Sequence, residues 1–304
     1  MVRDRSLAYR MIDWVLYAIL IIMALSCLLP FLHLLAKSFS DKAAVSANVI
    51  AFWPLGFNTE NYAYVLSDRQ FISSFGVSTV RVLLGVVLTL IITVVTAYPL
   101  SRDRVHMPGR TVIKVMFLIG MLFSAGLIPY FLAVRNLGLY NNFLVLVIPG
   151  ALSIFNTIVV MNFFRGIPVE LEEAAVLDGA THLQILFRVF IPVSLPVLAT
   201  ITLFTAVGHW NSWFDGIVFL SKSESWPLQS FMYTIITSRM LEWQTSGIGM
   251  NQQNAAQSAQ SFINATPQGL VAAMIFIASL PIMMVYPFLQ RYFVTGLTIG
   301  SVKG

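Results

Sequence analysis

The residues that could do chemistry are concentrated in one polar interval, residues 165–192, which lies between two long apolar stretches. Glu170, Glu172 and Glu173 crowd its start. Carboxylates can pair with basic groups of a partner, and small side chains allow another backbone to approach closely. Four small residues follow the acids: Ala174, Ala175, Gly179 and Ala180. The interval suits a docking surface, although an ordinary amphipathic connector along a membrane is the simpler interpretation of its composition.

Local signals predict two helices in this interval. Pro168 suits the first turn of a helix, where its missing N–H costs nothing. The acids then lie near the positive end of the helix dipole, and Gly179 is a suitable terminator. A second helix is expected over about 181–189, with Pro192 at its end. We therefore expect a helix–turn–helix with an exposed acidic elbow.

A second group of polar residues lies near the end of another apolar run. This run offers His209, Trp210, Asn211, Trp213 and Asp215. Their aromatic, amide and carboxylate groups suit the wall of a path for a polar solute such as a sugar. Polar groups within a membrane usually face the bundle interior or a water-filled cavity. Tryptophans near the end of a span also form ordinary interfacial belts, so both interpretations stay open.

Two more polar residues interrupt apolar runs. Arg81 could meet an acidic sugar, but pairing with an acid such as Asp215, or snorkelling to the surface, is the simpler expectation. Asn156 is a further candidate for a cavity wall. Pro129, Pro149 and Pro196 are expected to mark kinks or broken helices, which transporters tolerate where partners or water satisfy the freed carbonyls.

Composition places the chain in a lipid bilayer. Of its 304 residues, 58% are hydrophobic and 10% charged, against about 25% charged in a typical soluble domain. The net charge of +5 does not indicate nucleic acid, because the basic residues flank apolar segments and set topology there. The single cysteine, Cys27, can form no internal disulfide.

Six apolar segments are long enough to cross a bilayer, which takes about 20 helical residues. They are continuous apolar runs and lack the alternation of barrel strands. They cover about 12–35, 72–100, 112–134, 143–164, 193–220 and 270–293. The first is too long for a signal peptide. We expect an all-α integral membrane protein with a single transmembrane domain over 1–304.

The basic residues predict the orientation of these segments. With the N-terminus in the cytoplasm, eleven Lys and Arg residues fall inside and six outside, as the positive-inside rule requires. Both termini are then cytoplasmic. The polar interval 165–192, between the fourth and fifth segments, is cytoplasmic as well.

Catalytic chemistry is not expected of this chain. It has no Gly-x-x-x-x-Gly-Lys-Ser/Thr phosphate loop, so we expect it neither to bind nor to hydrolyse ATP. Its four histidines show no metal-binding spacing: His33, His106, His182 and His209. A membrane-embedded metalloenzyme is therefore disfavoured, and we expect no metal and no cofactor in the chain itself.

The spacing within 165–192 resembles the EAA loop of permeases in binding-protein-dependent ABC importers of the carbohydrate-uptake type. That loop has Glu-Ala-Ala, three residues, Gly, nine residues, and then aliphatic-x-aliphatic-Pro. The matching residues are Glu173, Ala174, Ala175, Gly179, Val189, Ile191 and Pro192, with Asp178 before the glycine. Val189 stands where isoleucine is more common.

Other segments extend the resemblance over nearly the whole chain. Residues 58–62, 97–102 and the tail 296–304 look like the corresponding parts of the smaller maltose-type permease. Segments 126–129 and 210–214 look most like the lipoprotein-type branch. That branch is associated with complex oligosaccharides, including uronate-rich ones.

The resemblance implies a type I importer fold and a defined assembly in the bacterial inner membrane. This chain would form a heterodimer with a second, non-identical permease subunit. An extracytoplasmic sugar-binding protein would deliver an oligosaccharide, and two ATP-binding subunits, which hold ATP and Mg, would drive alternating access. Of these implications, the acidic, uronate-type cargo has the weakest support in the resemblance.

The resemblance also implies where the ATPase subunits would be contacted. The implied coupling residues are Glu172, Glu173, Ala174, Ala175, Asp178, Gly179, Val189 and Pro192. The tail 295–304, with Gly300, Val302 and Lys303, is similar to one that enters the ATPase interface.

A self-contained secondary transporter of a small polar solute is the alternative. Such transporters often have internal repeats and acidic ion sites at the membrane midplane. This chain shows no clear repeat, and its acids cluster in loops. Uptake that persists without ATP would favour this alternative.

Overall fold

The computed structural model describes residues 7–102, 105, 107–246 and 266–300, and every element within them is helical. The expected all-α class is therefore confirmed. Contacts divide the chain into two compact units. Unit 1 comprises Met1–Arg69 and Ile235–Leu280, and unit 2 comprises Gln70–Thr234 and Pro281–Gly304. The two units are described separately.

Unit 1 is built on a helix that is apolar on all sides, as suits a helix surrounded by lipid. Its elements are α1 (Leu7–Ser38), α2 (Lys42–Ser46), α3 (Glu60–Ser67), the later part of α13 (Leu228–Ser246) and the first part of α15 (Pro267–Gly300). Hydrogen bonds fasten α3 to the end of α1. Asn61 Nδ2 donates to the carbonyl oxygen of Ser38 at 3.0 Å, and the Ser38 and Tyr62 hydroxyls are 2.7 Å apart.

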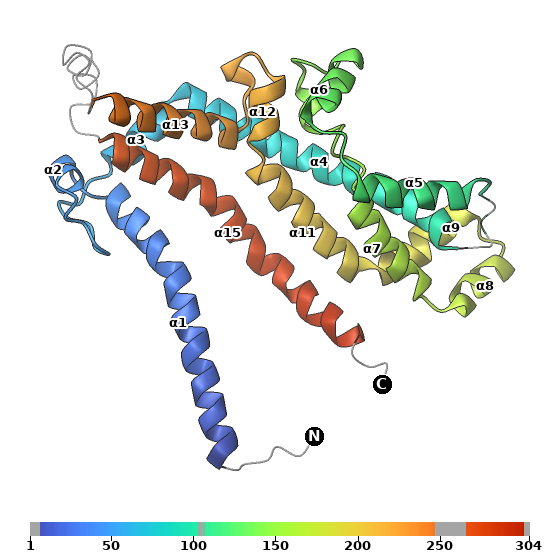
Figure 1. Ribbon diagram of the computed structural model, residues 1–304. Helices are drawn as coiled ribbons and strands as arrows, with labels where there is room; N and C mark the ends of the chain where they lie inside the picture. Colours follow the sequence, from blue (N-terminus) through green and yellow to red (C-terminus); the bar gives the residue numbers. More distant parts are fainter. Residues whose placement is uncertain (1–6, 103–104, 106, 247–265, 301–304) are drawn as a thin grey trace. The chain divides into compact units, whose positions relative to one another are not determined.

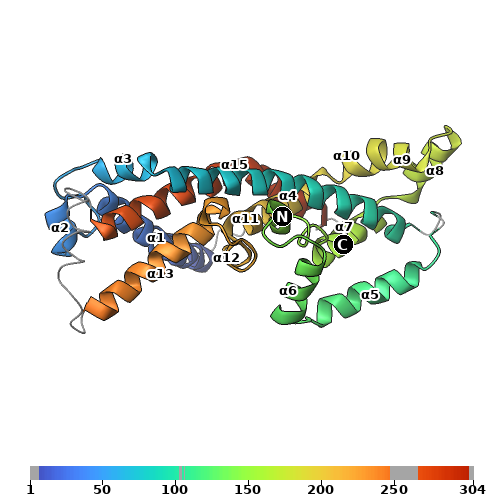
Figure 2. The ribbon, with the colours of Figure 1, turned by 90° about the horizontal axis from the view of Figure 1, so that it is seen from above.

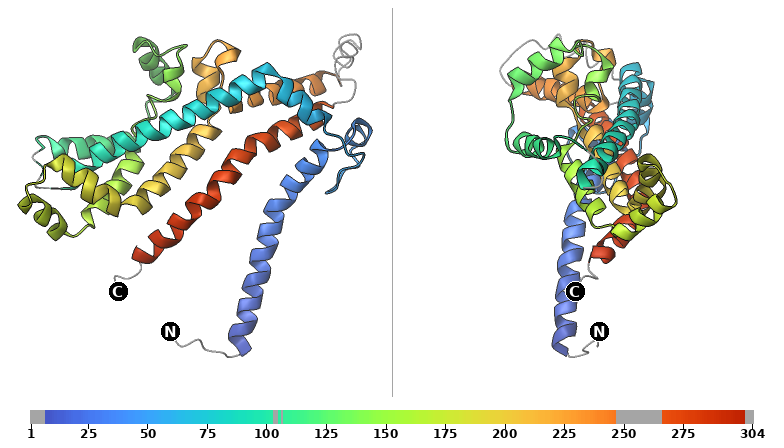
Figure 3. Two further views of the ribbon diagram at one scale, coloured as in Figure 1. Left: turned by 180° about the vertical axis from the view of Figure 1, so that it is seen from behind. Right: turned by 90° about the vertical axis from the view of Figure 1, so that its right-hand side faces the viewer.

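Unit 2 contains both regions that the sequence singles out. Its long helix α4 (Arg69–Ser101) runs beside α7 and α11 in Figures 1 and 3. The elements that follow α4 are α5 (Arg110–Leu122), α6 (Leu127–Asn136), η1 (Phe143–Leu146), α7 (Ile154–Arg165), α8 (Val169–Leu177), α9 (His182–Ile185), the π-helical turn η2 (Leu186–Phe190), α10 (Ile191–Val193), α11 (Leu195–Asn211), α12 (Phe214–Phe219), η3 (Ser223–Ser225) and the start of α13. Helices α8 and α9 lie at the end of the unit where α4 ends (Figure 1).

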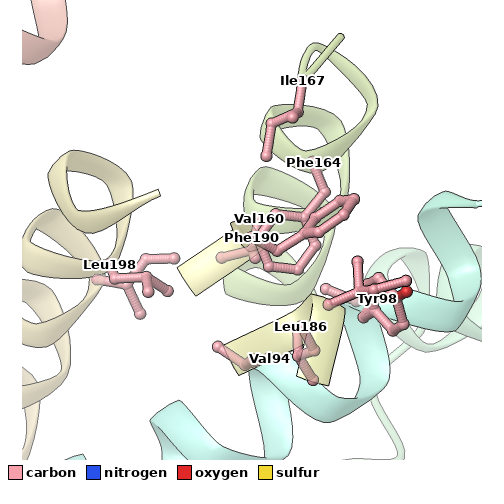
Figure 4. Packing of buried hydrophobic residues seen from close by; sticks show 11 residues of the cluster. Val94, Tyr98, Val160, Phe164, Ile167, Leu186, Phe190 and Leu198 are labelled. Carbon is pink, nitrogen blue, oxygen red and sulfur yellow. The ribbon is translucent and has the colours of Figure 1, made fainter. Parts of the chain in front are cut away.

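One apolar cluster fixes that end of unit 2 (Figure 4). It joins side chains of α4, α7, α9, η2 and α11. Its buried members are Val94, Ala97, Tyr98, Val160, Phe164, Ile167, Ile185, Leu186, Phe190, Leu198 and Ile201. Phe190 is fully buried and meets the rings of Tyr98 and Phe164 edge-on, at centroid distances of 5.0 and 5.2 Å. Such pairs add stabilisation beyond the area that they bury.

Three described helices are long and apolar enough to cross a membrane: Arg10–Ser38, Arg69–Ser101 and Pro267–Val285. Two bent helix pairs would raise this number to five if each were one span. They are Ile154–Arg165 with Val169–Leu177, bent by 75°, and His182–Val193 with Leu195–Asn211, bent by 81°. The six spans inferred from hydropathy therefore remain a prediction.

Three of the expected segments are broken in the structure. Segment 112–134 is split into α5 and α6, which meet at a bend in Figure 2, because Phe123 is extended and Gly126 has φ +78°. Within 143–164, a turn that contains Pro149 separates η1 from α7. Within 193–220, Ser212 is extended and separates α11 from α12. Pro129 and Pro196 lie in first helical turns directly after bends, so all three prolines mark breaks as expected.

Phe190→Ala should destabilise the protein by about 3–5 kcal/mol, because it removes a buried ring that three helical elements enclose. Thermal unfolding of the detergent-purified protein measures this loss. Phe187→Ala is the matched control, since Phe187 lies in the same turn but is 61% exposed. Equal losses for the two variants would contradict the assigned core.

Candidate functional site

The polar interval forms the expected helix–turn–helix, and local hydrogen bonds build its turn. The second helix does not end at Pro192 as expected, because it continues through η2 into α10 and ends at Val193. Helix α8 ends in a Schellman motif, in which Ala180 N–H donates to the Ala175 carbonyl and Gly179 N–H donates to the Val176 carbonyl, both at 3.0 Å. Gly179 has φ +78°, where a residue with a Cβ would be strained. Thr181 and Gln184 then form a capping box that starts α9. We call residues 168–185 the elbow.

The carboxylate of Glu172 points into the protein. Its side chain is 2% exposed, and its Oε2 lies 3.3 Å from Nε of Arg102. Arg102 is the residue that directly follows α4. Arg102 Nη2 also donates to the carbonyl oxygens of Phe164 and Ile167, at 2.8 and 2.7 Å. The guanidinium carbon lies 4.9 Å from the centroid of the Phe190 ring. One buried cation thus joins α4, the end of α7, the elbow and η2.

The other predicted coupling residues differ in exposure. Ala174, Asp178 and Gly179 are exposed, whereas Glu173 and Ala175 are partly buried. Val189 packs against the apolar cluster of Figure 4, and Pro192 is exposed in α10. Of the tail residues, Gly300 ends α15, while Val302 and Lys303 lie outside the described residues.

Leu177 is a surface feature that the sequence analysis missed. It is the last residue of α8, directly before the turn, and it is 88% exposed. It is the most exposed of several apolar side chains on this surface, which also include Val176 and Leu183. Exposed apolar groups that lie together are typical of a protein contact surface. The available signal was its place one residue before the Asp-Gly pair that ends the helix.

A polar cavity of about 440 Å³ lies elsewhere in unit 2. Helices α4, α7 and α11 and the segment leading to α12 contribute its polar wall. The lining residues are Arg81, Thr89, Tyr130, Val145, Leu146, Gly150, Ser153, Asn156, Phe204, Thr205, Gly208, His209, Ser212 and Asp215. Its size is that of a small-molecule site, for which volumes of about 300–1,000 Å³ are common.

An ion pair forms one side of this cavity. Arg81 is 3% exposed, and its two terminal nitrogens bind the two carboxylate oxygens of Asp215, with Nη1 at 3.0 Å from Oδ1. The expected pairing of Arg81 with Asp215 is therefore confirmed. Ser212 Oγ and the Gly216 N–H also donate to Asp215 Oδ1, at 3.0 and 2.9 Å. A bidentate pair of this kind fixes the guanidinium in both position and plane.

Three of the six predicted path residues line the cavity: Arg81, Asn156 and Asp215. Trp210 is buried and meets the ring of Phe75 edge-on instead. Asn211 is exposed, and Trp213 stacks on Tyr233 with ring centroids 4.1 Å apart. The structure does not bring these three residues to the cavity.

His209, singled out in the sequence, lines the cavity, but the sequence analysis missed three lining residues that share a pattern with it. Thr205, Gly208, His209 and Ser212 are spaced i, i+3, i+4 and i+7, which places them on one helix face. Such a stripe in an apolar helix indicates a cavity wall. Among the described residues, no three His, Cys, Asp or Glu side chains lie close enough to hold a metal ion.

Comparison with known proteins gives consistent similarities. Residues 104–299 match the sequence profile of the family described as binding-protein-dependent transport system inner membrane component. Protein LplC of Bacillus subtilis is 39% identical over 91% of this chain and 90% of its own length. The polygalacturonan/rhamnogalacturonan transport system permease protein YtcP of the same organism is 36% identical over 97% of this chain and 99% of its own.

Solved structures of similar chains agree with these sequence similarities. A chain from the crystal structure of a bacterial ABC transporter involved in the import of the acidic polysaccharide alginate matches with a TM-score of 0.84 at 34% identity, covering 96% of this chain and 100% of that one. A chain from the alginate transporter in complex with an alginate pentasaccharide-bound periplasmic protein has a TM-score of 0.55 at 15% identity, with 95% and 96% covered. The second match shows a shared fold alone.

Glu172→Leu should destabilise the protein by about 3–5 kcal/mol, because it leaves the buried Arg102 guanidinium without its counter-charge. Adding Arg102→Met to this variant should cost less than Arg102→Met costs alone. Unfolding in mixed detergent–SDS micelles measures this double-mutant cycle. Glu170→Gln, on the exposed side of α8, is the control and should stay within about 0.5 kcal/mol of the parent. Additive effects of the two buried substitutions would contradict the pair.

Proposed function

The chain belongs to the family of inner membrane components of binding-protein-dependent transport systems, and from this membership we propose that it carries acidic oligosaccharides across the membrane. It is a permease of an ABC importer, located in the inner membrane. The observation that carries the acidic cargo is the match to the alginate importer chain, which extends over 96% of this chain. The similarity to a polygalacturonan/rhamnogalacturonan permease supports the same substrate class, since alginate and polygalacturonan are both polymers of uronic acids.

We place this permease in a complex with three kinds of partner. A second, non-identical permease subunit completes the membrane path, and a sugar-binding protein delivers the oligosaccharide from outside. The description of the family as a binding-protein-dependent transport system supports the binding-protein partner. Two ATP-binding subunits hold ATP and Mg and perform hydrolysis, because this chain has no phosphate loop.

We propose that the elbow is the coupling element received by an ATPase subunit. Its exposed residues Ala174, Leu177, Asp178 and Gly179 contact the partner, together with Glu173. Glu172 has a different task, since its pair with Arg102 holds the elbow to α4 from inside. The tail residues Gly300, Val302 and Lys303 reach the same ATPase interface in this proposal.

The proposed topology has six spans and both termini in the cytoplasm. Excess basic charge on the cytoplasmic segments supports it. Each broken segment then combines two helices in one crossing, while α8 and α9 lie at the cytoplasmic surface. Closure of the ATPase subunits moves the elbow, and α4 and α11, which pack on it through the apolar cluster, turn to open the path to the other side.

Reconstitution tests the cargo. The assembled transporter, with its binding protein, should hydrolyse ATP faster when the binding protein carries oligogalacturonate or oligoalginate. Maltooligosaccharides of equal length are the control, since they have the same ring size without carboxylates. Stimulation by the neutral sugars alone would overturn the acidic cargo, and uptake that persists without ATP would overturn the importer.

Gly179→Trp should uncouple ATP hydrolysis from uptake, lowering the rate of transport per ATP by about tenfold. Apart from the two chain neighbours of Gly179, no described residue has an atom within 4 Å of a Cβ built there, so the added side chain extends into space that we assign to the partner. The ratio of oligosaccharide uptake to ATP hydrolysis in proteoliposomes measures coupling. Gly179→Ala is the control, because it shares the backbone strain at φ +78° without the bulk. Unchanged coupling in the Trp variant would remove the elbow from the ATPase interface.

A further inference from the structure

Arg81 presents one of its two hydrogen-bonding edges to the cavity. A guanidinium has an end-on edge, formed by Nη1 and Nη2, and a side edge, formed by Nε and Nη2. Asp215 occupies the end-on edge, and Nη1 also donates to the carbonyl of Ser212 at 3.3 Å. In the described part of the chain, the second N–H of Nη2 has no acceptor within hydrogen-bond distance.

Among the described residues, a histidine alone binds the side edge. Arg81 Nε donates to His209 Nδ1 at 3.4 Å, which is long for a hydrogen bond to a charged donor. His209 lies against Gly85, where a Cβ would collide with its imidazole ring. The imidazole therefore packs against a glycine and is bound weakly to the arginine. Arg81 and His209 both line the cavity.

We propose that the side edge of Arg81 is a binding site for the carboxylate of a uronic acid residue during transport. This inference rests on the proposed acidic cargo. A carboxylate at this edge would accept from Nε and Nη2 in a bidentate fork, and it would replace the imidazole of His209. Because Asp215 is held by Ser212 and Gly216, it stays in place behind the guanidinium and keeps the fork oriented.

The rest of the cavity suits the hydroxyl groups of the same sugar. Asn156, Ser153, Thr205 and Tyr130 line it with amide and hydroxyl groups. Asn156 is 8% exposed, and its Nδ2 donates only a long bond, of 3.4 Å, to Thr205 Oγ1. A sugar hydroxyl between these two groups would form shorter bonds than the two form with each other.

Arg81 and Asp215 together leave the cavity without net charge, which fits a transport site. A lone buried arginine would hold an anion tightly and release it slowly, whereas a guanidinium already neutralised by Asp215 binds a carboxylate through its remaining N–H groups. The site therefore discriminates by the geometry of the side edge rather than by net charge. Replacing the guanidinium of Arg81 should then weaken carboxylate binding even when the new side chain keeps the positive charge.

The test is equilibrium binding of trigalacturonate to the assembled transporter in nanodiscs, measured by titration calorimetry without the binding protein. Arg81→Lys keeps the ion pair with Asp215 but lacks the fork, and it should weaken trigalacturonate binding by about tenfold. The methyl-esterified trisaccharide has no carboxylate, so Arg81→Lys and the wild type should bind it with equal affinity. His209→Ala should strengthen trigalacturonate binding severalfold, because the side edge is then open.

Arg135→Gln is the matched control, since it removes an exposed arginine of α6 that does not line the cavity. Equal affinities of wild type and Arg81→Lys for trigalacturonate, or weaker binding by His209→Ala, would overturn the site. If uronate-loaded binding protein still stimulates ATP hydrolysis in that case, the acidic cargo stands and only the site fails. If uronates neither bind nor stimulate while neutral sugars do, both fail.

Discussion

The buried guanidinium of Arg102 is the interaction on which this end of the permease depends. A cation with so little exposure must be compensated on all sides, and here a carboxylate, two backbone carbonyls and an aromatic ring provide that compensation. The carboxylate comes from α8, the carbonyls from the end of α7 and the turn after it, and the ring from η2. One side chain therefore sets their relative placement through an ion pair and two hydrogen bonds, and it adds a polar anchor to the apolar contacts that hold the elbow.

The parts of the structure that depend on neighbouring residues could be predicted from the sequence. The turn at Gly179 needs a left-handed backbone, the capping box needs Thr181 and Gln184, and prolines mark the breaks at the starts of α6, α7 and α11. Each of these signals acts within a few residues, so it is present in the order of the chain. The expected partner of Arg81 was found for a related reason, since few acids lie within the apolar segments.

What depends on tertiary packing could not be predicted in this way. Glu172 belongs to an acidic run and seemed suited to an external partner, but Arg102, 70 positions earlier in the chain, turns it inward. Trp210 and Trp213 were candidates by residue type, yet Trp210 packs edge-on with Phe75 and Trp213 stacks on Tyr233. The contact of His209 with Gly85 joins two helices, and nothing in the segment around Gly85 indicates that an imidazole lies against it. Helical periodicity predicts which residues share one face of a helix. Which other element packs against that face is known only from the folded structure.

Helix α4 sets the distance between the two arginines of unit 2. Arg81 lies within it and Arg102 follows its last residue, so 21 positions separate them, or about 30 Å of helix. Adding or deleting a single residue in this stretch would turn one arginine about 100° around the helix axis relative to the other. Either the cavity or the elbow would then lose its cation. The number of residues between the two arginines is thus as constrained as their identity, and length variation among related permeases is expected in the loops that flank α4 and not within it.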